Sequence, residues 1–154
     1  VEVEITESML FRDLGEVARS LTKLRDLGFK LSVDDFGTGY SSLGYLRDLP
    51  LDALKIDRQF VSDIGEDAVS GPICEAIIGV AHSLGLRVIG EGIETEVQLR
   101  ALQRSGCDEF QGFLLARPLT ARQFEYWLLN RRHPLAEKYG SPDVDELATR
   151  AQAG

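Results

Sequence analysis

The sequence predicts an α/β protein in which helices cover a parallel β-sheet. Short apolar segments alternate along the chain with longer segments whose apolar residues recur at helical spacing, and such alternation is typical of parallel sheets. Polar and charged residues also gather at one end of the successive strands. Because an isolated buried charge costs several kcal/mol, a sheet has no structural need to collect charges there. This second observation indicates a functional site at the strand ends.

Five segments have the length and composition of strands, and each is bounded by turn residues. The first alternates apolar and acidic side chains, as a half-buried strand does, and the second has the character of a buried strand. In chain order they are residues 1–7, 29–34, 53–57, 86–90 and 107–110.

Helices are predicted between these strands from the apolar spacing and from the residues at their ends. Ser8, Thr95 and Thr120 are suited to cap the helices that follow them, and Pro50 ends a short helix at 43–49. The helix that contains Pro72 in its first turn extends to residue 84. Residues 58–67 are predicted to form a loop. The helices expected in this way cover residues 8–27, 43–49, 72–84, 95–105 and 120–128.

The composition is that of a soluble globular domain. The 154 residues are 44% hydrophobic and 27% charged, which is enough for one domain with a sizeable core. The net charge of −8 argues against a nucleic-acid groove, so no DNA or RNA polymer is expected as a partner. Cys74 and Cys107 are the only cysteines and indicate a reducing compartment. Val1 lies inside a predicted strand, which suggests a piece of a longer protein.

The second strand leads into Asp34-Asp35-Phe36-Gly37-Thr38-Gly39, where two carboxylates precede a glycine-rich loop at 36–42. Adjacent strand residues point to opposite faces, so Asp34 and Asp35 converge only if the pleat breaks between them. Paired carboxylates at a strand end suit a hard divalent cation. A solvated turn, in which Asp and Gly are common, accounts for the same residues, and this stretch alone leaves both interpretations open.

Polar residues end the other strands in the same way. In a (β/α)8 barrel the active site lies at the C-terminal ends of the strands, and we favour that architecture. A doubly wound, flavodoxin-like sheet is the alternative and would place its site where the strand order reverses. The residues in question are Glu4, Glu7, Asp34, Asp35, Lys55, Asp57, Glu91, Glu94 and Gln111.

Together these stretches resemble the second half of the EAL domain, the family of bacterial cyclic di-GMP phosphodiesterases. The resemblance implies a TIM-like (β/α)8 barrel of which this chain supplies about strands four to eight, in residues 1–132, with 133–154 as a weakly structured tail. The family's Glu-Ala-Leu motif and the metal-binding asparagine that follows it are not in this sequence. The matching stretches are Glu4-Ile5-Thr6-Glu7-Ser8, Asp34-Asp35-Phe36-Gly37-Thr38-Gly39, Lys55-Ile56-Asp57, Glu91-Gly92-Ile93-Glu94-Thr95 and Gln111-Gly112-Phe113.

The resemblance implies a metal-dependent enzyme that hydrolyses cyclic di-GMP to linear pGpG. Glu4, Asp34 and Asp35 match metal ligands of a two-metal site. Oxygen ligands favour Mg²⁺ or Mn²⁺ over Zn²⁺, and Ca²⁺ is expected to inhibit because it prefers longer bonds and more ligands. Because the upstream ligands are not in this sequence, the isolated chain is expected to be inactive.

The remaining roles also come from the resemblance. Lys55 matches the lysine that holds and polarises the attacking water, and Glu91 matches a general base, with a place in the metal shell as the open alternative. Gln111 and Glu94 are expected at the substrate. Glu7 matches the glutamate that anchors the loop at 36–42.

A catalytically inactive cyclic di-GMP receptor or interaction module is the alternative function, since two expected metal ligands are not in this sequence. The expected partners are cyclic di-GMP and a second copy of the chain in a homodimer. Sensor or GGDEF-type domains are expected elsewhere in the full-length protein. A cytoplasmic location is expected, with any membrane anchor supplied by such other domains.

Overall fold

The computed structural model describes residues 1–10, 14–37, 43–65, 67 and 69–124. The loop positions 38–42, the end of the helix predicted at 120–128 and the tail at 133–154 lie outside the described residues. Residues 1–114 form one compact unit and residues 115–154 a second. In the second unit residues 121–124 are helical, and Thr120 Oγ1 accepts the Gln123 N–H at 3.4 Å, which confirms the cap predicted there.

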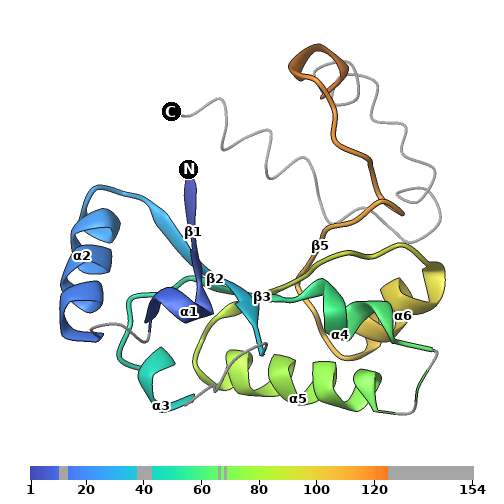
Figure 1. Ribbon diagram of the computed structural model, residues 1–154, viewed down its shortest axis with the longest axis horizontal. Helices are drawn as coiled ribbons and strands as arrows, with labels where there is room; N and C mark the ends of the chain where they lie inside the picture. The colour runs from blue at the N-terminus through green and yellow to red at the C-terminus, as the bar shows by residue number, and fades with distance from the viewer. Residues whose placement is uncertain (11–13, 38–42, 66, 68, 125–154) are drawn as a thin grey trace. The chain divides into compact units, whose positions relative to one another are not determined.

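The first unit is built on a five-stranded sheet. Every neighbouring pair of strands is parallel, and the order in the sheet is the order in the sequence (Figure 1). A doubly wound sheet reverses its strand order, so the flavodoxin-like alternative is wrong for the described residues. The strands are β1 (Glu2–Thr6), β2 (Lys30–Phe36), β3 (Ala53–Ile56), β4 (Arg87–Gly90) and β5 (Glu109–Phe110).

Helices connect the strands, and α5 packs against β3 and β4 beside α4 and α6 (Figure 1). Within the described residues, no helix combines the length and the apolar character that crossing a membrane requires. The helices are α1 (Glu7–Leu10), α2 (Leu14–Asp26), α3 (Leu43–Leu46), α4 (Arg58–Ser62), α5 (Ser70–Ser83) and α6 (Glu96–Arg104).

Two helix predictions were wrong. Ser8 is not an N-cap, because α1 already begins at Glu7, while residues 11–13, between α1 and α2, lie outside the described residues. Residues 58–67 are not simply a loop, since they contain α4. Asp57 begins that helix by accepting the Gln59 N–H at 2.8 Å. Because the same aspartate also ends the β3 segment, its role as an N-cap was not evident from the sequence.

The two faces of the sheet differ in chemistry. Paired residues of neighbouring parallel strands point to the same face. One row of pairs joins Ile5, Val33, Leu54 and Val88, all of which are buried. Helices pack against this apolar face, and the core of the unit lies between them. The opposite face carries the charged residues of the strands.

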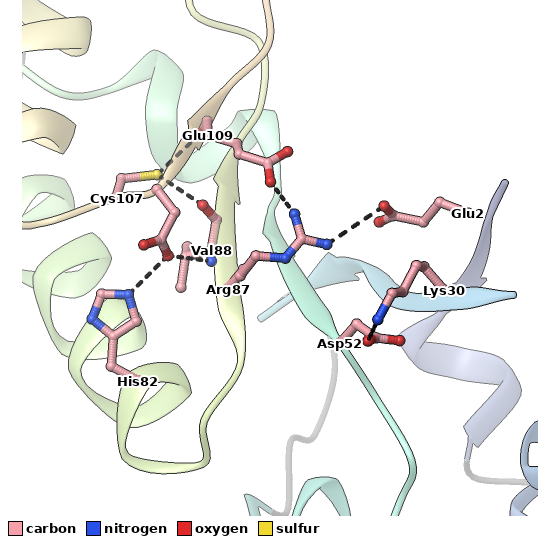
Figure 2. A network of polar contacts seen from close by, with 9 residues as sticks. Glu2, Lys30, Asp52, His82, Arg87, Val88, Cys107 and Glu109 are labelled. Carbon is pink, nitrogen blue, oxygen red and sulfur yellow. Dashed lines mark hydrogen bonds and ion pairs between the residues drawn. The ribbon is translucent and has the colours of Figure 1, made fainter. Parts of the chain in front are cut away.

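Ion pairs join the N-terminal ends of the strands on this charged face (Figure 2). Arg87 of β4 pairs with Glu109 of β5 and with Glu2 of β1, whose Oε2 lies 3.7 Å from Arg87 Nη2. Lys30 of β2 pairs with Asp52, immediately before β3, at an Nζ–Oδ1 distance of 2.6 Å. These contacts form two groups, Arg87 with Glu2 and Glu109, and Lys30 with Asp52, at the end of the sheet opposite the predicted site (Figure 2).

His82 and Cys107 lie among structural contacts in the first unit (Figure 2), and Cys74 is buried as well. His82 Nε2 lies 2.9 Å from Asp108 Oδ2, which also accepts the Val88 N–H at 2.7 Å. Cys74 and Cys107 are free and buried, and burial raises the pKa of both thiols to about 11. Both cysteines therefore stay protonated at neutral pH and act as small core residues.

Asp52→Asn is expected to destabilise the protein at neutral pH. Burial by itself raises the pKa of Asp52, but hydrogen bonds from Lys30 and from the Leu31 N–H outweigh it, so the pKa lies below 3.8. A lowered folded-state pKa means that the carboxylate contributes stability above about pH 4, which is lost as the pH falls through the folded value. We expect a loss of about 1 kcal/mol at pH 7.

Urea unfolding of both proteins at pH 7 and near pH 2 measures this effect. The difference between them should shrink as the pH falls through the folded-state pKa of Asp52, because the carboxyl of the unsubstituted protein then becomes neutral. Asp48→Asn is the control, because Asp48 and its partner Arg47 are both exposed and such pairs contribute little. A deficit of the same size at both pH values would contradict the assignment.

Candidate active site

Lys55 lies at the centre of the polar cluster at the C-terminal ends of the strands. Its side chain, on β3, is only 4% exposed. The Lys55 Nζ lies 2.7 Å from Glu4 Oε1, 2.7 Å from Glu91 Oε1 and 3.3 Å from Asp34 Oδ1. The carboxylates come from β1, from the residue after β4 and from β2. Four residues predicted from separate strand ends therefore meet.

A bulge in β2 shapes this end of the strand. Val33 and Phe36 pair with residues only two positions apart on β3, so β2 contains one additional residue between them. Asp35 adopts a φ of +56°, in the left-handed region that residues other than glycine seldom occupy. The break in the pleat that Asp34 and Asp35 required in order to converge is confirmed.

The cluster contains more negative charge than one lysine balances. Burial and the charges of Asp34 and Asp57 raise the pKa of Asp35 above 3.8, and a hydrogen bond with the Asp57 carboxyl acts in the same direction. Burial also raises the pKa of Glu91 above 4.5, and the hydrogen bond from Lys55 offsets this only in part. A bound cation would neutralise this excess of carboxylate.

Lys55 keeps its proton in this arrangement. Burial by itself lowers the pKa of a lysine, but hydrogen bonds to Glu4 and Glu91 and the charge of Asp34 raise the pKa above its ordinary value of 10.5. The ammonium group is a compact positive charge with several donors, so it can hold an anionic oxygen as well as these carboxylates.

The donor chemistry of the cluster fits a hard divalent cation. Glu4, Asp34 and Asp35 offer carboxylate oxygens, which suit Mg²⁺ and Mn²⁺. Glu4 and Asp34 are instead bonded to Lys55, and among the described residues no three acidic, histidine or cysteine side chains are spaced to hold one ion. Metal ligation by these residues therefore stays a prediction.

Glu7 connects the start of α1 to the loop after β2. Its side chain is 2% exposed, and its Oε2 accepts the Gly37 N–H at 2.9 Å. Gly37 has a φ of +96°, which favours glycine. The residue expected to anchor the loop thus contacts the part of the loop that the structure describes.

Glu94 and Gln111, the expected substrate-binding residues, lie just beyond β4 and β5. Glu94 Oε1 accepts a hydrogen bond from Arg58 Nη2 at 2.8 Å, and both side chains are exposed. Gln111 is exposed, and its backbone N–H donates to Gly90 O at 2.8 Å. The structure places both residues on segments that start at the strand ends, and their contact with substrate stays a prediction.

The segments after β4 and β5 approach each other very closely at Gly112. The Ile93 N–H donates to Gln111 O at 3.1 Å, and the Leu114 N–H donates to Ile93 O at 3.0 Å. A Cβ at Gly112 would lie 2.1 Å from the Ile93 O. Only glycine fits between these two backbones.

Three contacts near the site were not predicted from the sequence. The sequence places Asp57 at a strand end and predicts no role for it, whereas in the structure it caps α4 and forms a hydrogen bond with Asp35. Arg58 pairs with Glu94, and no local sequence pattern predicts this contact. Gln98 is buried, and its position three residues after Thr95 is the visible signal of a capping box.

The EAL domain model matches residues 1–118. The chain belongs to the EAL domain family. Cyclic di-GMP phosphodiesterase PA2567 of Pseudomonas aeruginosa is 47% identical to this EAL-domain chain over 128 residues, which are 83% of this chain and 22% of the relative. The chain thus spans about a fifth of the length of that relative.

Solved EAL domains share the fold of this chain. The EAL domain of Mycobacterium smegmatis DcpA is 42% identical with a TM-score of 0.81, and the match covers 87% of this chain and 60% of that one. A phosphodiesterase named PaMucR, in complex with cyclic di-GMP, is 45% identical with a TM-score of 0.77, covering 80% and 50%. BlrP1 of Klebsiella pneumoniae, with manganese and cyclic di-GMP, is 36% identical with a TM-score of 0.71, covering 77% and 30%. The five parallel strands are therefore part of a TIM-like barrel.

Proposed function

We propose that this chain contributes a cluster of five residues, called the Lys55 cluster, to a phosphodiesterase that hydrolyses cyclic di-GMP to linear pGpG with Mg²⁺ or Mn²⁺. The cluster consists of Glu4, Asp34, Asp35, Lys55 and Glu91. One observation carries the proposal: a buried lysine is bonded to carboxylates from three strand ends, in a chain 47% identical to a cyclic di-GMP phosphodiesterase. In this proposal residues 1–132 belong to the barrel and residues 133–154 are a tail.

The residues of the Lys55 cluster have separate roles in the proposed reaction. Glu4, Asp34 and Asp35 would hold two divalent ions, which supply a more acidic water and neutralise phosphate charge when bound. The Lys55 ammonium, held by its carboxylates, orients the attacking water. Glu91 accepts a proton from that water or completes the metal shell.

The other assignments concern the substrate and its surroundings. Gln111 and Glu94 would bind the dinucleotide, and Glu7 would anchor the loop that closes on it. A homodimer is part of the proposal, and in the 154-residue chain alone a second copy would cover an edge, since β1 and β5 each have one neighbour among the described strands. Two free thiols suit the cytoplasm, and sensor or GGDEF-type domains would control the activity.

The test is an assay of the full-length protein with cyclic di-GMP, with products separated by chromatography. Linear pGpG should accumulate with Mn²⁺ or Mg²⁺, should not form in excess chelator, and should form more slowly when Ca²⁺ is added. The 154-residue chain alone should form none. Turnover in chelator would contradict the metal requirement, and tight binding without product would favour the receptor alternative.

Glu7→Ala is expected to lower kcat by about tenfold or more, since loss of positioning around a site has effects of this size. The buried carboxylate accepts the Gly37 N–H, and alanine leaves that donor without its partner. Glu7→Gln keeps an acceptor and should recover most of the rate. Glu75→Ala, at an exposed position of α5, is the control. A Glu7→Ala enzyme as active as the Glu75→Ala enzyme would show that the loop needs no anchor.

A further inference from the structure

Gln98 makes more hydrogen bonds than the start of a helix requires. Its side chain is 6% exposed, and its Oε1 accepts the backbone N–H groups of Glu94 at 2.8 Å and Thr95 at 2.9 Å. Its Nε2 donates to Ser62 O at 3.2 Å. A capping box needs only the bond to Thr95, which Glu provides as well as Gln. Of the other two bonds, the one from Glu94 holds the segment of residues 91–95, called the β4–α6 segment, and the one to Ser62 O reaches the end of α4.

Two polar contacts join α4 to residues that follow β4, one at each end of the helix. Arg58 begins α4 and pairs with Glu94 at 2.8 Å, while Ser62 ends α4 and accepts the Gln98 amide. The Arg58 pair is exposed, and exposed pairs contribute little. The Gln98 amide is buried, so leaving its acceptor unpaired is costly. Arg58 also packs its side chain against Gly92, and Gln98 adds a part-buried hydrogen bond at the other end of α4.

Both segments begin at the Lys55 cluster. α4 follows the strand that carries Lys55, and Glu91 is the first residue of the β4–α6 segment. The Glu91 N–H donates to Ile56 O at 3.2 Å, and its carboxylate accepts from Lys55 at 2.7 Å. A shift of the segment relative to α4 would therefore change the distance between Glu91 and Lys55.

We propose that Gln98 is a positioning residue that holds Glu91 against Lys55 by joining the β4–α6 segment to Ser62. Gln98 acts through the backbone of residues 94 and 95 and through the end of α4, and it has no need to touch the substrate. The inference rests on the proposed phosphodiesterase function of the same cluster. It adds a specific claim: the side-chain amide, and not only an acceptor oxygen, is required at this position.

Gln98→Glu in the full-length protein separates positioning from capping. Glutamate keeps acceptor oxygens for the N–H groups of Glu94 and Thr95 but has no N–H to donate to Ser62 O. With cyclic di-GMP and Mn²⁺ we expect kcat to fall by about tenfold or more and KM to change by less than about threefold, because the interaction serves the reacting geometry.

Thr95→Ala is the matched control. It removes the Oγ1 that accepts the Gln98 N–H at 3.3 Å and leaves the Gln98 amide in place. The urea midpoint of this variant should fall, as it does when a helix cap is lost, while kcat stays within about twofold. The proposal is overturned if Gln98→Glu keeps the full kcat, or if Thr95→Ala loses as much kcat as Gln98→Glu does.

Amide hydrogen exchange over residues 91–95 gives a readout that needs no substrate. Exchange at Glu91 should become faster in Gln98→Glu, where the segment is no longer joined to Ser62, and should stay unchanged in Thr95→Ala. If the unsubstituted protein does not hydrolyse cyclic di-GMP, the proposed function fails, and the exchange result still decides the role of Gln98. Faster exchange supports it, and unchanged exchange overturns it.

Discussion

Lys55→Met is expected to lower the kcat of the full-length protein for cyclic di-GMP by about a thousandfold, the size of effect seen when a charge-stabilising group is removed. The Lys55 ammonium is the positive charge of a cluster in which three carboxylates surround it. Methionine has a similar length but cannot orient a water molecule. In the proposed mechanism the lysine acts on the water and not on the substrate, so binding of cyclic di-GMP should persist, and calorimetry in Ca²⁺ measures that binding.

Lys30→Met is the matched control for this substitution. Lys30 lies at the N-terminal end of β2, is exposed and pairs with Asp52 away from the site. Its loss should leave kcat unchanged while removing the same charge from the protein. If the Lys55→Met enzyme turned over at the rate of the Lys30→Met enzyme, the role of Lys55 in the reaction would be refuted.

Gly112→Ala is expected to destabilise the protein by about 3 kcal/mol or more, at the upper end of single substitutions. The added Cβ would lie 2.1 Å from the O, 2.3 Å from the N and 2.7 Å from the C of Ile93. These are backbone atoms and cannot rotate away as a side chain can. Relief would separate the segments after β4 and β5 and break the bonds of Ile93 to Gln111 and Leu114.

Gly79→Ala provides the comparison, because it makes the same change where there is room. Gly79 lies inside α5, and nothing lies within 4 Å of its added Cβ. Alanine is the better helix former by about 1 kcal/mol, so this variant should be slightly more stable than the unsubstituted protein. Urea unfolding compares the two. If the Gly112→Ala and Gly79→Ala variants had equal free energies of unfolding, the segments around Gly112 would separate without cost.

The Lys55 cluster was predictable because its signals are local. Each of its residues lies in or directly after the C-terminal half of a predicted strand, and parallel strands bring such ends to one edge. Even the bulge was required by the neighbouring positions of Asp34 and Asp35, since a regular pleat would send them to opposite faces. The five strands were found for the same reason, because a strand's pattern is contained in its own residues.

Contacts between distant residues could not be predicted in this way. Arg58 contacts Glu94, and Gln98 contacts Ser62, only after β3 and β4 have paired. That pairing sets the position of α4 relative to the residues that follow β4. A lone arginine or glutamine in the sequence has many such partners available. The sequence did not predict α4, because an aspartate in this position is typical both of a strand end and of a helix N-cap. In the structure Asp57 directly follows β3 and also caps α4.

The order of the strands has a consequence for synthesis on the ribosome. Since β1 to β5 stand in the sheet in the order in which they occur in the chain, each new strand emerges when its neighbour has already been made. Parallel pairing is slow because a long connection must close before the pairing forms. Translation at about 5–20 residues per second gives each pairing time before the next strand appears. The sheet can therefore grow one strand at a time, with a single exposed growing edge.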